Sequence, residues 1–226
     1  MKNMQIAVDG PASSGKSTVS QIVAERLGII YIDTGAMYRA VTLAVLNQGI
    51  AVENENEVER LIEDIQLEFK RSQDGAQETY LNGKNVSKEI RSDRVTDNVS
   101  IISSYPFVRD YLVAKQRLMA ESSSVIMDGR DIGTVVLPNA NYKFYLNASA
   151  KVRAQRRYLE NIEKGHSNQT LEEIEQAIIH RDYIDSNREY SPLVKASDAI
   201  EIDTDSYSIE DVVNVIIEQT KGKNAE

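Results

Sequence analysis

The chain has 226 residues, with 26 lysines and arginines against 35 aspartates and glutamates, a formal net charge of −9 at pH 7, and no cysteine. This length suffices for one large hydrophobic core, or for one core with a small appended unit. The acidic balance argues against a nonspecific nucleic-acid-binding surface. Without cysteine there are no disulfides, thiolate metal sites or cysteine nucleophiles. With only His166 and His180, a multi-histidine metal site is not expected.

The N-terminal stretch carries no recognisable targeting or membrane signal. It reaches an aspartate by residue 9, and no later run approaches the roughly 18 apolar residues of a spanning helix. We therefore expect a cytoplasmic protein with neither a membrane nor a nucleic acid as partner. The negative charge, together with the lack of an obvious exposed apolar stripe, favours a monomer.

The first part of the chain alternates between strand and helix patterns. An apolar run at residues 4–9 is followed by the Gly/Pro/Ser-rich stretch 10–15, after which apolar residues recur at helical spacing up to Leu27. Residues 28–33 are typical of a second strand, and residues 35–49 of a second helix. Such an alternation predicts a parallel sheet.

The segment from about residue 64 to 91 changes character. Its first part alternates apolar and polar residues with period two, and Asn82-Gly83 then lies between strand-like residues, which is a strong hairpin signal. We predict a small antiparallel insertion here. Beyond it the patterns predict helices at 93–105, 106–121, 149–165, 170–189 and 208–220, and strands at 124–128, 142–147 and 199–203.

The stretch GPASSGKS, residues 10–17, fits the pattern G-x-x-x-x-G-K-[ST] between a predicted strand and a predicted helix. Its glycines let backbone N–H groups turn onto phosphate oxygens, and the helix N-terminus adds partial positive charge. We expect Lys16 to reach the β- and γ-phosphates and Ser17 to coordinate Mg²⁺. The motif predicts a nucleotide without naming the reaction. The predicted ATP site comprises Gly10, Pro11, Ala12, Ser13, Ser14, Gly15, Lys16, Ser17 and Thr18.

Arginines recur where strands and loops should converge. Transfer between two phosphate-bearing substrates brings like charges together, so several guanidinium groups are needed to neutralise them and hold the reacting oxygens in line. A second nucleotide is the natural acceptor, and no guanine-reading Asn-Lys-x-Asp element is present. The arginines concerned are Arg39, Arg94, Arg109, Arg130, Arg153, Arg156, Arg157, Arg181 and Arg188.

Acidic residues accompany two of these arginine clusters. Asp128 ends an apolar strand pattern, where it could hold Mg²⁺ through water or serve only as a turn or cap residue. Asp131 follows Arg130 in the next loop, where the alternative is a surface ion pair. Arg181, Asp185 and Arg188 are spaced to share one helix face, a pattern that also fits an exposed set of ion pairs.

Five stretches together resemble the bacterial cytidylate kinases, in that family's order and over nearly the whole chain: VDGPASSGKST, IDTGAMYRA, YPFVRDYLVAKQR, MDGRDIGTVVLPNA and RDYIDSNRE. The family often has Gly-Ala where this chain has Ser13-Ser14. The resemblance implies an α/β, P-loop nucleoside monophosphate kinase fold with a parallel five-stranded core sheet flanked by helices. It implies one domain over 1–226, with a core at about 1–63, 92–150 and 188–226, a small antiparallel insertion at about 64–91, and a short helical lid at about 151–170.

The resemblance also implies a (d)CMP kinase that uses ATP and Mg²⁺ to phosphorylate CMP, and also dCMP, by direct in-line transfer. Carried over by motif, Arg39 and Arg130 bind the CMP phosphate, and Arg153 and Arg157 lie near the transferring phosphoryl group, with Lys16 and Arg130 also catalytic. Thr34, Arg109, Asp131 and Arg188 surround cytosine, while Ser100, Arg181 and Asp185 hold the ribose.

The chemistry of the base supports one of these roles independently. Cytosine offers an N4 amino donor, which a carboxylate can accept, whereas uracil presents an oxygen that a carboxylate repels. We therefore predict that Asp131 discriminates CMP from UMP. Two alternatives stay open: a kinase with a different acceptor, such as shikimate or another nucleotide, and a P-loop switch or regulatory module that binds ATP without a monophosphate partner.

Overall fold

The computed structural model describes residues 3–72, 77–164 and 169–222, so His166 lies outside the described residues. The chain forms two compact units. The first comprises Met1–Ile32 with Arg117–Glu226, and the second comprises Asp33–Gln116. The finer division into a core, an insertion and a lid stays a prediction.

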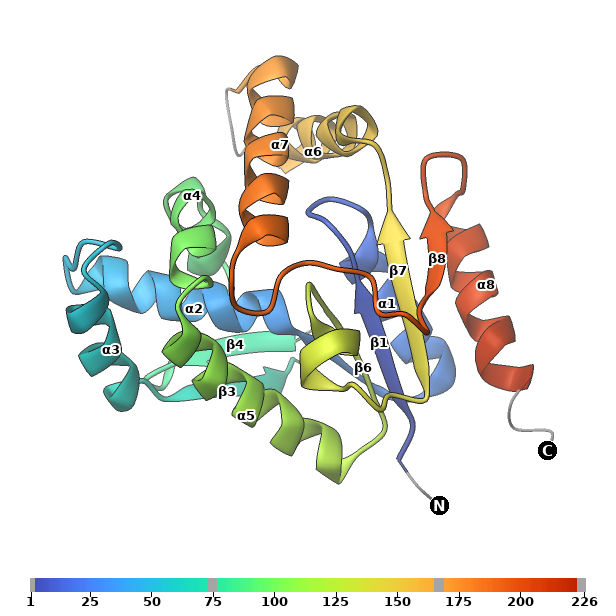
Figure 1. Cartoon of the computed structure of the whole chain (residues 1–226), viewed down its shortest axis with the longest axis horizontal. Helices are drawn as coiled ribbons and strands as arrows, with labels where there is room; N and C mark the ends of the chain where they lie inside the picture. Colours follow the sequence, from blue (N-terminus) through green and yellow to red (C-terminus); the bar gives the residue numbers. More distant parts are fainter. Residues whose placement is uncertain (1–2, 73–76, 165–168, 223–226) are drawn as a thin grey trace. The chain divides into compact units, whose positions relative to one another are not determined.

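The first unit is built on a five-stranded sheet in the order β2-β6-β1-β7-β8 (Figure 1). β1 pairs in parallel with both β6 and β7, and β7 pairs in parallel with β8. The predicted parallel five-stranded core is thereby confirmed. Its strands are β1 (Gln5–Asp9), β2 (Ile30–Asp33), β6 (Val125–Gly129), β7 (Tyr142–Asn147) and β8 (Ile200–Asp203).

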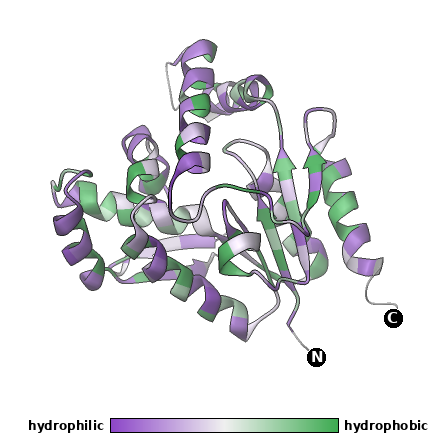
Figure 2. Ribbon diagram, in the orientation of Figure 1, coloured by the Kyte–Doolittle hydropathy of each residue, from purple (hydrophilic) through white to green (hydrophobic). Residues whose placement is uncertain are grey.

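Helices α1 (Lys16–Leu27) and α8 (Ile209–Gly222) pack against each other and against this sheet, α1 on β1 and β6 and α8 on β7. Figure 2 colours these strands with a mixture of hydrophobic and hydrophilic residues. Strands β1 and β6 carry the continuous apolar runs 6–8 and 125–127, as expected for a parallel sheet covered by helices. Side chains of the sheet form a buried core with the two helices that includes Ile6, Val8, Val23, Phe144, Leu146, Val213 and Ile216.

Helices α6 (Ala150–Lys164) and α7 (Leu171–Asn187) form a pair that packs through a small apolar cluster. A capping box begins α7: the N–H of Glu173 donates to the Thr170 hydroxyl at 3.2 Å, and the N–H of Thr170 donates to the Glu173 carboxylate at 2.8 Å. The predicted helix 170–189 ends at Asn187, two residues early. Arg188 is the C-cap of the helix: its N–H still donates to Ile184 O at 3.1 Å, and its guanidinium lies 3.9 Å from Asp185, as the spacing predicted.

The second unit carries the small antiparallel sheet that the sequence predicted. Asn82 and Gly83 turn with φ of 50° and 79°, the backbone that favours these residues in two-residue hairpins. A buried core that includes Met37, Val41, Val58, Ile102 and Leu112 joins the sheet to the helices. The elements are α2 (Thr34–Asn47), α3 (Glu55–Asp64), β3 (Leu67–Arg71), β4 (Gln77–Leu81), β5 (Lys84–Asn85), the 3-10 turn Glu89–Arg91, α4 (Asp93–Ile102) and α5 (Pro106–Ser122), whose last turns belong to the first unit.

Within the described ranges, none of the helices combines the length and apolar character needed to cross a membrane.

Candidate functional site

The P-loop joins β1 to α1, and its glycines are required by the backbone. Gly10 has φ of +148°, and a Cβ there would lie 2.1 Å from the carbonyl oxygen of Leu146 on β7. Gly15 caps the N-terminus of α1 with φ of +89°. The loop thus runs closer to the sheet than a residue with a side chain would allow.

Three backbone carbonyls of the loop accept hydrogen bonds from side chains. Lys16 Nζ donates to Pro11 O at 2.7 Å, Arg153 Nη1 to Ala12 O at 3.2 Å, and Thr204 Oγ1 to Ser14 O at 3.3 Å. Arg153 comes from α6 and Thr204 follows β8. These bonds fix the orientation of three peptide planes of the loop, which preorganises a phosphate site.

Ser13 occupies a left-handed backbone conformation, with φ of 60°, where a residue with a Cβ is strained by about 1 kcal/mol. We expect Ser13→Gly to raise the free energy of unfolding by up to about 1 kcal/mol, measured by urea unfolding, since glycine adopts this φ freely but also gains entropy when unfolded.

Ser191 provides a matched control, because it is a serine with φ of 53° outside the P-loop. We expect Ser191→Gly to give a similar gain in stability and Ser13→Gly alone to change the affinity for ATP. Lower stability of Ser13→Gly than of the wild type would contradict the strain assignment.

Lys16 is buried, with 5% of its surface exposed. The pKa of the Lys16 ammonium is lowered to about 7, mainly by burial and also by the nearby Arg130 guanidinium, while the carboxylates of Asp128 and Asp9 oppose the shift. The folded protein therefore holds a poorly solvated cation at the centre of the loop. An anionic phosphate would supply a negative charge that stabilises the Lys16 ammonium.

Asp128, at the end of β6, is buried and meets the start of α1. The Ser17 hydroxyl donates to Asp128 Oδ2 at 2.7 Å, and the Tyr31 hydroxyl donates to Oδ1 at 3.0 Å. The hydroxyl and carboxylate oxygens of Ser17 and Asp128 are hard ligands of the kind that Mg²⁺ takes. Among the described residues, no group of three or more His, Cys, Asp or Glu side chains is arranged so that it could hold a metal ion.

Asp9 is a site residue that the sequence reasoning missed. It ends β1, and its buried carboxylate accepts hydrogen bonds from the N–H groups of Ile132 and Gly133, both at 2.7 Å. Burial raises the pKa of Asp9 to about 7, although the two backbone hydrogen bonds oppose the shift. The available signal was an acidic residue ending an otherwise apolar strand directly before the P-loop.

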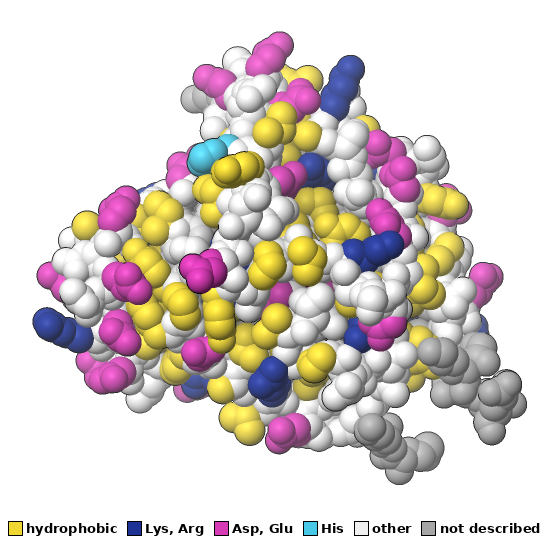
Figure 3. Space-filling view, in the orientation of Figure 1, with side chains coloured by type: hydrophobic (Ala, Val, Ile, Leu, Met, Phe, Trp, Pro, Cys, Tyr) yellow, Lys and Arg dark blue, Asp and Glu magenta, His cyan; other side chains and the backbone are white. Residues whose placement is uncertain are grey.

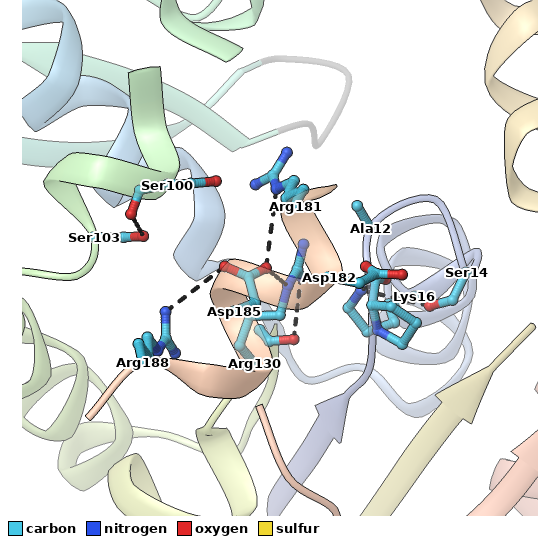
Figure 4. Close-up of polar contacts among 12 residues, drawn as sticks. Ala12, Ser14, Lys16, Ser100, Ser103, Arg130, Arg181, Asp182, Asp185 and Arg188 are labelled. Atoms are coloured by element: carbon cyan, nitrogen blue, oxygen red, sulfur yellow. Dashed lines mark hydrogen bonds and ion pairs between the residues drawn. The ribbon is translucent and has the colours of Figure 1, made fainter. Parts of the chain in front are cut away.

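Asp185, on α7, lies at the centre of an arginine cluster (Figure 4). Its carboxylate is 2.9 Å from Arg130 Nε, 3.9 Å from Arg181 Nε and 3.9 Å from Arg188 Nη1. Only 3% of Asp185 is exposed, so the cluster is not a solvated set of ion pairs. Burial raises the pKa of Asp185, but the three guanidinium groups outweigh burial and the net shift is downward.

The predicted lid arginines lie on α6 with different environments. Arg153 is buried and donates to Asp182 at 2.5 Å as well as to the P-loop. Arg157 is half-buried and lies 3.5 Å from Glu160. Arg156 donates to the backbone and side chain of Thr204, at 2.6 and 3.0 Å. In this conformation Arg153 and Arg156 support the P-loop and Thr204, and their action on a phosphoryl group stays a prediction.

Four predicted acceptor residues lie in the second unit: Thr34 and Arg39 on α2, Ser100 on α4 and Arg109 on α5. Asp33 caps α2 by accepting from the N–H of Ala36 at 2.9 Å. Arg109 is fully buried, donates to Ser103 O at 3.0 Å and lies 5.1 Å from the ring centroid of Tyr38. These contacts hold the Arg109 guanidinium in a fixed place.

A parallel sheet whose first strand leads through a P-loop into a helix, with a buried lysine and a Ser–Asp pair at that loop, is characteristic of the P-loop nucleotide-binding proteins. The model of the cytidylate kinase family matches residues 6–222. The chain therefore belongs to the cytidylate kinase family.

The relatives agree along the whole length. The chain is 51% identical to a cytidylate kinase of Geobacillus sp. (strain WCH70), over 96% of both chains. It is 47% identical to that of Bacillus cereus (strain ATCC 10987), over 98% of this chain and 97% of the relative. A solved structure of an uncharacterized protein from Eubacterium ventriosum matches with a TM-score of 0.52 over 98% of this chain and 99% of that one, at 13% identity, which concerns the fold alone.

Proposed function

We propose that this enzyme transfers the γ-phosphoryl group of ATP directly to CMP, and to dCMP as a second substrate, in the cytoplasm and as a monomer. The observation that carries the proposal is the position of Arg130. Its guanidinium is bound to Asp185 in the arginine cluster and lies close enough to Lys16 to lower the pKa of that lysine. One side chain thus links the donor loop to the predicted acceptor residues.

The proposed reaction requires little covalent chemistry from the protein itself. In the proposal, Lys16 and the P-loop N–H groups hold the β- and γ-phosphates, and Arg39 and Arg130 hold the acceptor phosphate. An oxygen of the CMP phosphate attacks the γ-phosphorus while the bond to ADP breaks, so no enzyme nucleophile is required. Arg153 and Arg157 add positive charge near the transferring group.

Mg²⁺ would be held by the Ser17 hydroxyl, with Asp128 acting through a water molecule. When bound, the ion neutralises charge that develops on the phosphate oxygens. This proposal is supported by the hydrogen bond between Ser17 and Asp128, in which the hydroxyl oxygen and the carboxylate oxygen lie 2.7 Å apart at the N-terminus of α1.

The base and ribose complete the proposed acceptor site. Asp131 accepts from the cytosine amino group, and Thr34, Arg109 and Arg188 complete the base site. Ser100, Arg181 and Asp185 hold the ribose. Figure 3 shows Asp and Glu side chains spread over the face in view, with Lys and Arg between them, so phosphate capture in this proposal is local.

An ADP-release assay with ATP and each of CMP, dCMP, UMP, AMP and shikimate tests the proposal. CMP and dCMP should give the highest kcat/KM. Faster turnover with shikimate or AMP would favour a kinase with a different acceptor. If no acceptor stimulates turnover and CMP does not bind, the chain is an ATP-binding switch or regulatory module instead.

Asp131→Ala should lower the ratio of kcat/KM for CMP over UMP by about tenfold or more, because a matched hydrogen bond in a buried site is worth about 1–3 kcal/mol and the repulsion of uracil disappears. Steady-state kinetics with both acceptors measure the ratio. An unchanged ratio in a folded variant would contradict the role of Asp131.

A further inference from the structure

Asp9 and the loop after β6 are joined across 123 residues of chain. The Asp9 carboxylate accepts from the N–H groups of Ile132 and Gly133, with which the π-helical turn Ile132–Val136 begins. This turn follows Arg130 and Asp131 directly. The register of β1 against β6 pairs Asp9 with Gly129, so the carboxylate stands one strand away from the start of the loop.

The turn takes its cap from Asp9 and not from its own first residues. A helical turn leaves its first N–H groups without partners inside the turn. The backbone oxygen of Asp131 accepts from Val135 and Val136 at 2.8 and 3.1 Å, but the Asp131 side chain does not cap the turn. Because Asp9 accepts from these N–H groups, the Asp131 carboxylate is not needed for capping.

We propose that Asp9 is a positioning residue for the acceptor: by capping the turn after Asp131, it holds Arg130 and Asp131 in the geometry that CMP requires. This inference rests on the roles of Arg130 and Asp131 in the proposed function. Side chains that bind a reacting group must be held within a fraction of an ångström, and a misplacement of about 1 Å can cost a hundredfold in rate.

A competing explanation assigns Asp9 to the donor side alone, since its negative charge also stabilises the Lys16 cation. The two explanations differ in a measurable ratio. Lys16 serves the same ATP whether the acceptor is CMP or UMP, so any effect through Lys16 cancels when the two acceptors are compared. An effect through Asp131 does not cancel.

The test is Asp9→Asn in the full-length enzyme, with kcat and KM measured for CMP, UMP and ATP. Asparagine keeps the shape but offers one oxygen where two N–H groups need acceptors. We expect KM for CMP to rise about tenfold and the CMP/UMP ratio of kcat/KM to fall about tenfold. An unchanged ratio and an unchanged KM for CMP would overturn the proposal.

Gly133→Ala perturbs the same contact from the loop side, because a Cβ there would lie 3.3 Å from Asp9 Oδ2 and 3.2 Å from Lys143 Cδ. We expect the CMP/UMP ratio of kcat/KM to fall in this variant as well, but only by a few-fold. If Asp9→Asn does not fold, Gly133→Ala decides: a lowered ratio supports the proposal, and an unchanged ratio overturns it.

Asp203→Asn is the matched control. Asp203 ends β8, and its carboxylate accepts from the N–H of Asp205 at 3.0 Å, so it holds its own loop. The CMP/UMP ratio should stay as in the wild type, and an equal fall here would overturn the specific role of Asp9. If the proposed function itself is wrong, the wild-type enzyme will not prefer CMP. That result is distinct from an unchanged ratio in the Asp9 variant of an enzyme that does prefer CMP.

Discussion

Lys16→Met should lower kcat about a thousandfold, while the unliganded protein remains folded and as stable as the wild type or more so. Loss of one preorganised hydrogen-bond donor to developing negative charge costs about 10²–10³ in rate. We expect the upper end of this range because Lys16 also carries a positive charge. The stability result follows from burial: the pKa of Lys16 is lowered to about 7, so the folded state disfavours the charged form. Single-turnover kinetics with saturating ATP and CMP, and urea unfolding, measure the two effects.

Lys143 offers a matched control in the same unit. It is also buried and also donates to a backbone carbonyl, Pro138 O at 2.6 Å, but it has an ion-pair partner in Asp198 at 2.8 Å. Lys143→Met should therefore reduce stability and leave kcat within a few-fold of the wild type. If both variants lose activity alike, the assignment of Lys16 to the phosphoryl donor is wrong. If Lys16→Met unfolds, the stability expectation drawn from the burial of Lys16 is wrong.

Local signals in the sequence predicted the P-loop and the hairpin because each depends on contiguous residues. Gly10, Gly15 and Lys16 lie within one loop, and Asn82-Gly83 determines its own turn. The alternation of strand and helix patterns along the chain likewise predicted the parallel sheet. In these elements the local backbone preferences and the final fold agree.

Contacts between distant parts of the chain were not predictable in the same way. Asp9 caps a turn whose N–H groups lie 123 and 124 positions further along the chain, and no spacing rule relates residues that far apart. No local pattern indicated that the Arg153 guanidinium binds Asp182, the Ala148 carbonyl and a P-loop carbonyl, and its place near the phosphoryl group stays a prediction. By contrast, helical spacing did predict the approach of Arg188 to Asp185, because the two residues lie three positions apart at the end of one helix.

Asp185→Ala should destabilise the fold by about 3–5 kcal/mol and raise KM for CMP at least tenfold. Removing one partner of a buried ion pair leaves uncompensated charge, here the guanidinium groups of Arg130, Arg181 and Arg188. The same change frees Arg130 from the position proposed for the acceptor phosphate. Urea unfolding and steady-state kinetics measure the two effects.

Asp182→Ala, one turn earlier on α7, separates stability from acceptor binding, because Asp182 pairs with Arg153 and not with the cluster. It should lower stability while leaving KM for CMP within about twofold. If Asp185→Ala also leaves KM and kcat intact, the cluster serves only the fold.

The pH dependence of the unfolding free energy shows whether the surroundings of Asp185 favour its charged or its neutral form. The pKa of Asp185 is lowered in the folded state from its ordinary value of 3.8, so the folded protein binds its proton less readily than the unfolded chain. Its stabilising contribution is therefore fully present above about pH 5 and is lost as the pH falls through the folded pKa, below about pH 4. The difference in unfolding free energy between the wild type and Asp185→Asn should be constant from about pH 5 to 7 and shrink below about pH 4. A difference that grows on acidification would mean that burial outweighs the three guanidinium groups, and Asp185 would then be a neutral acid in the folded enzyme.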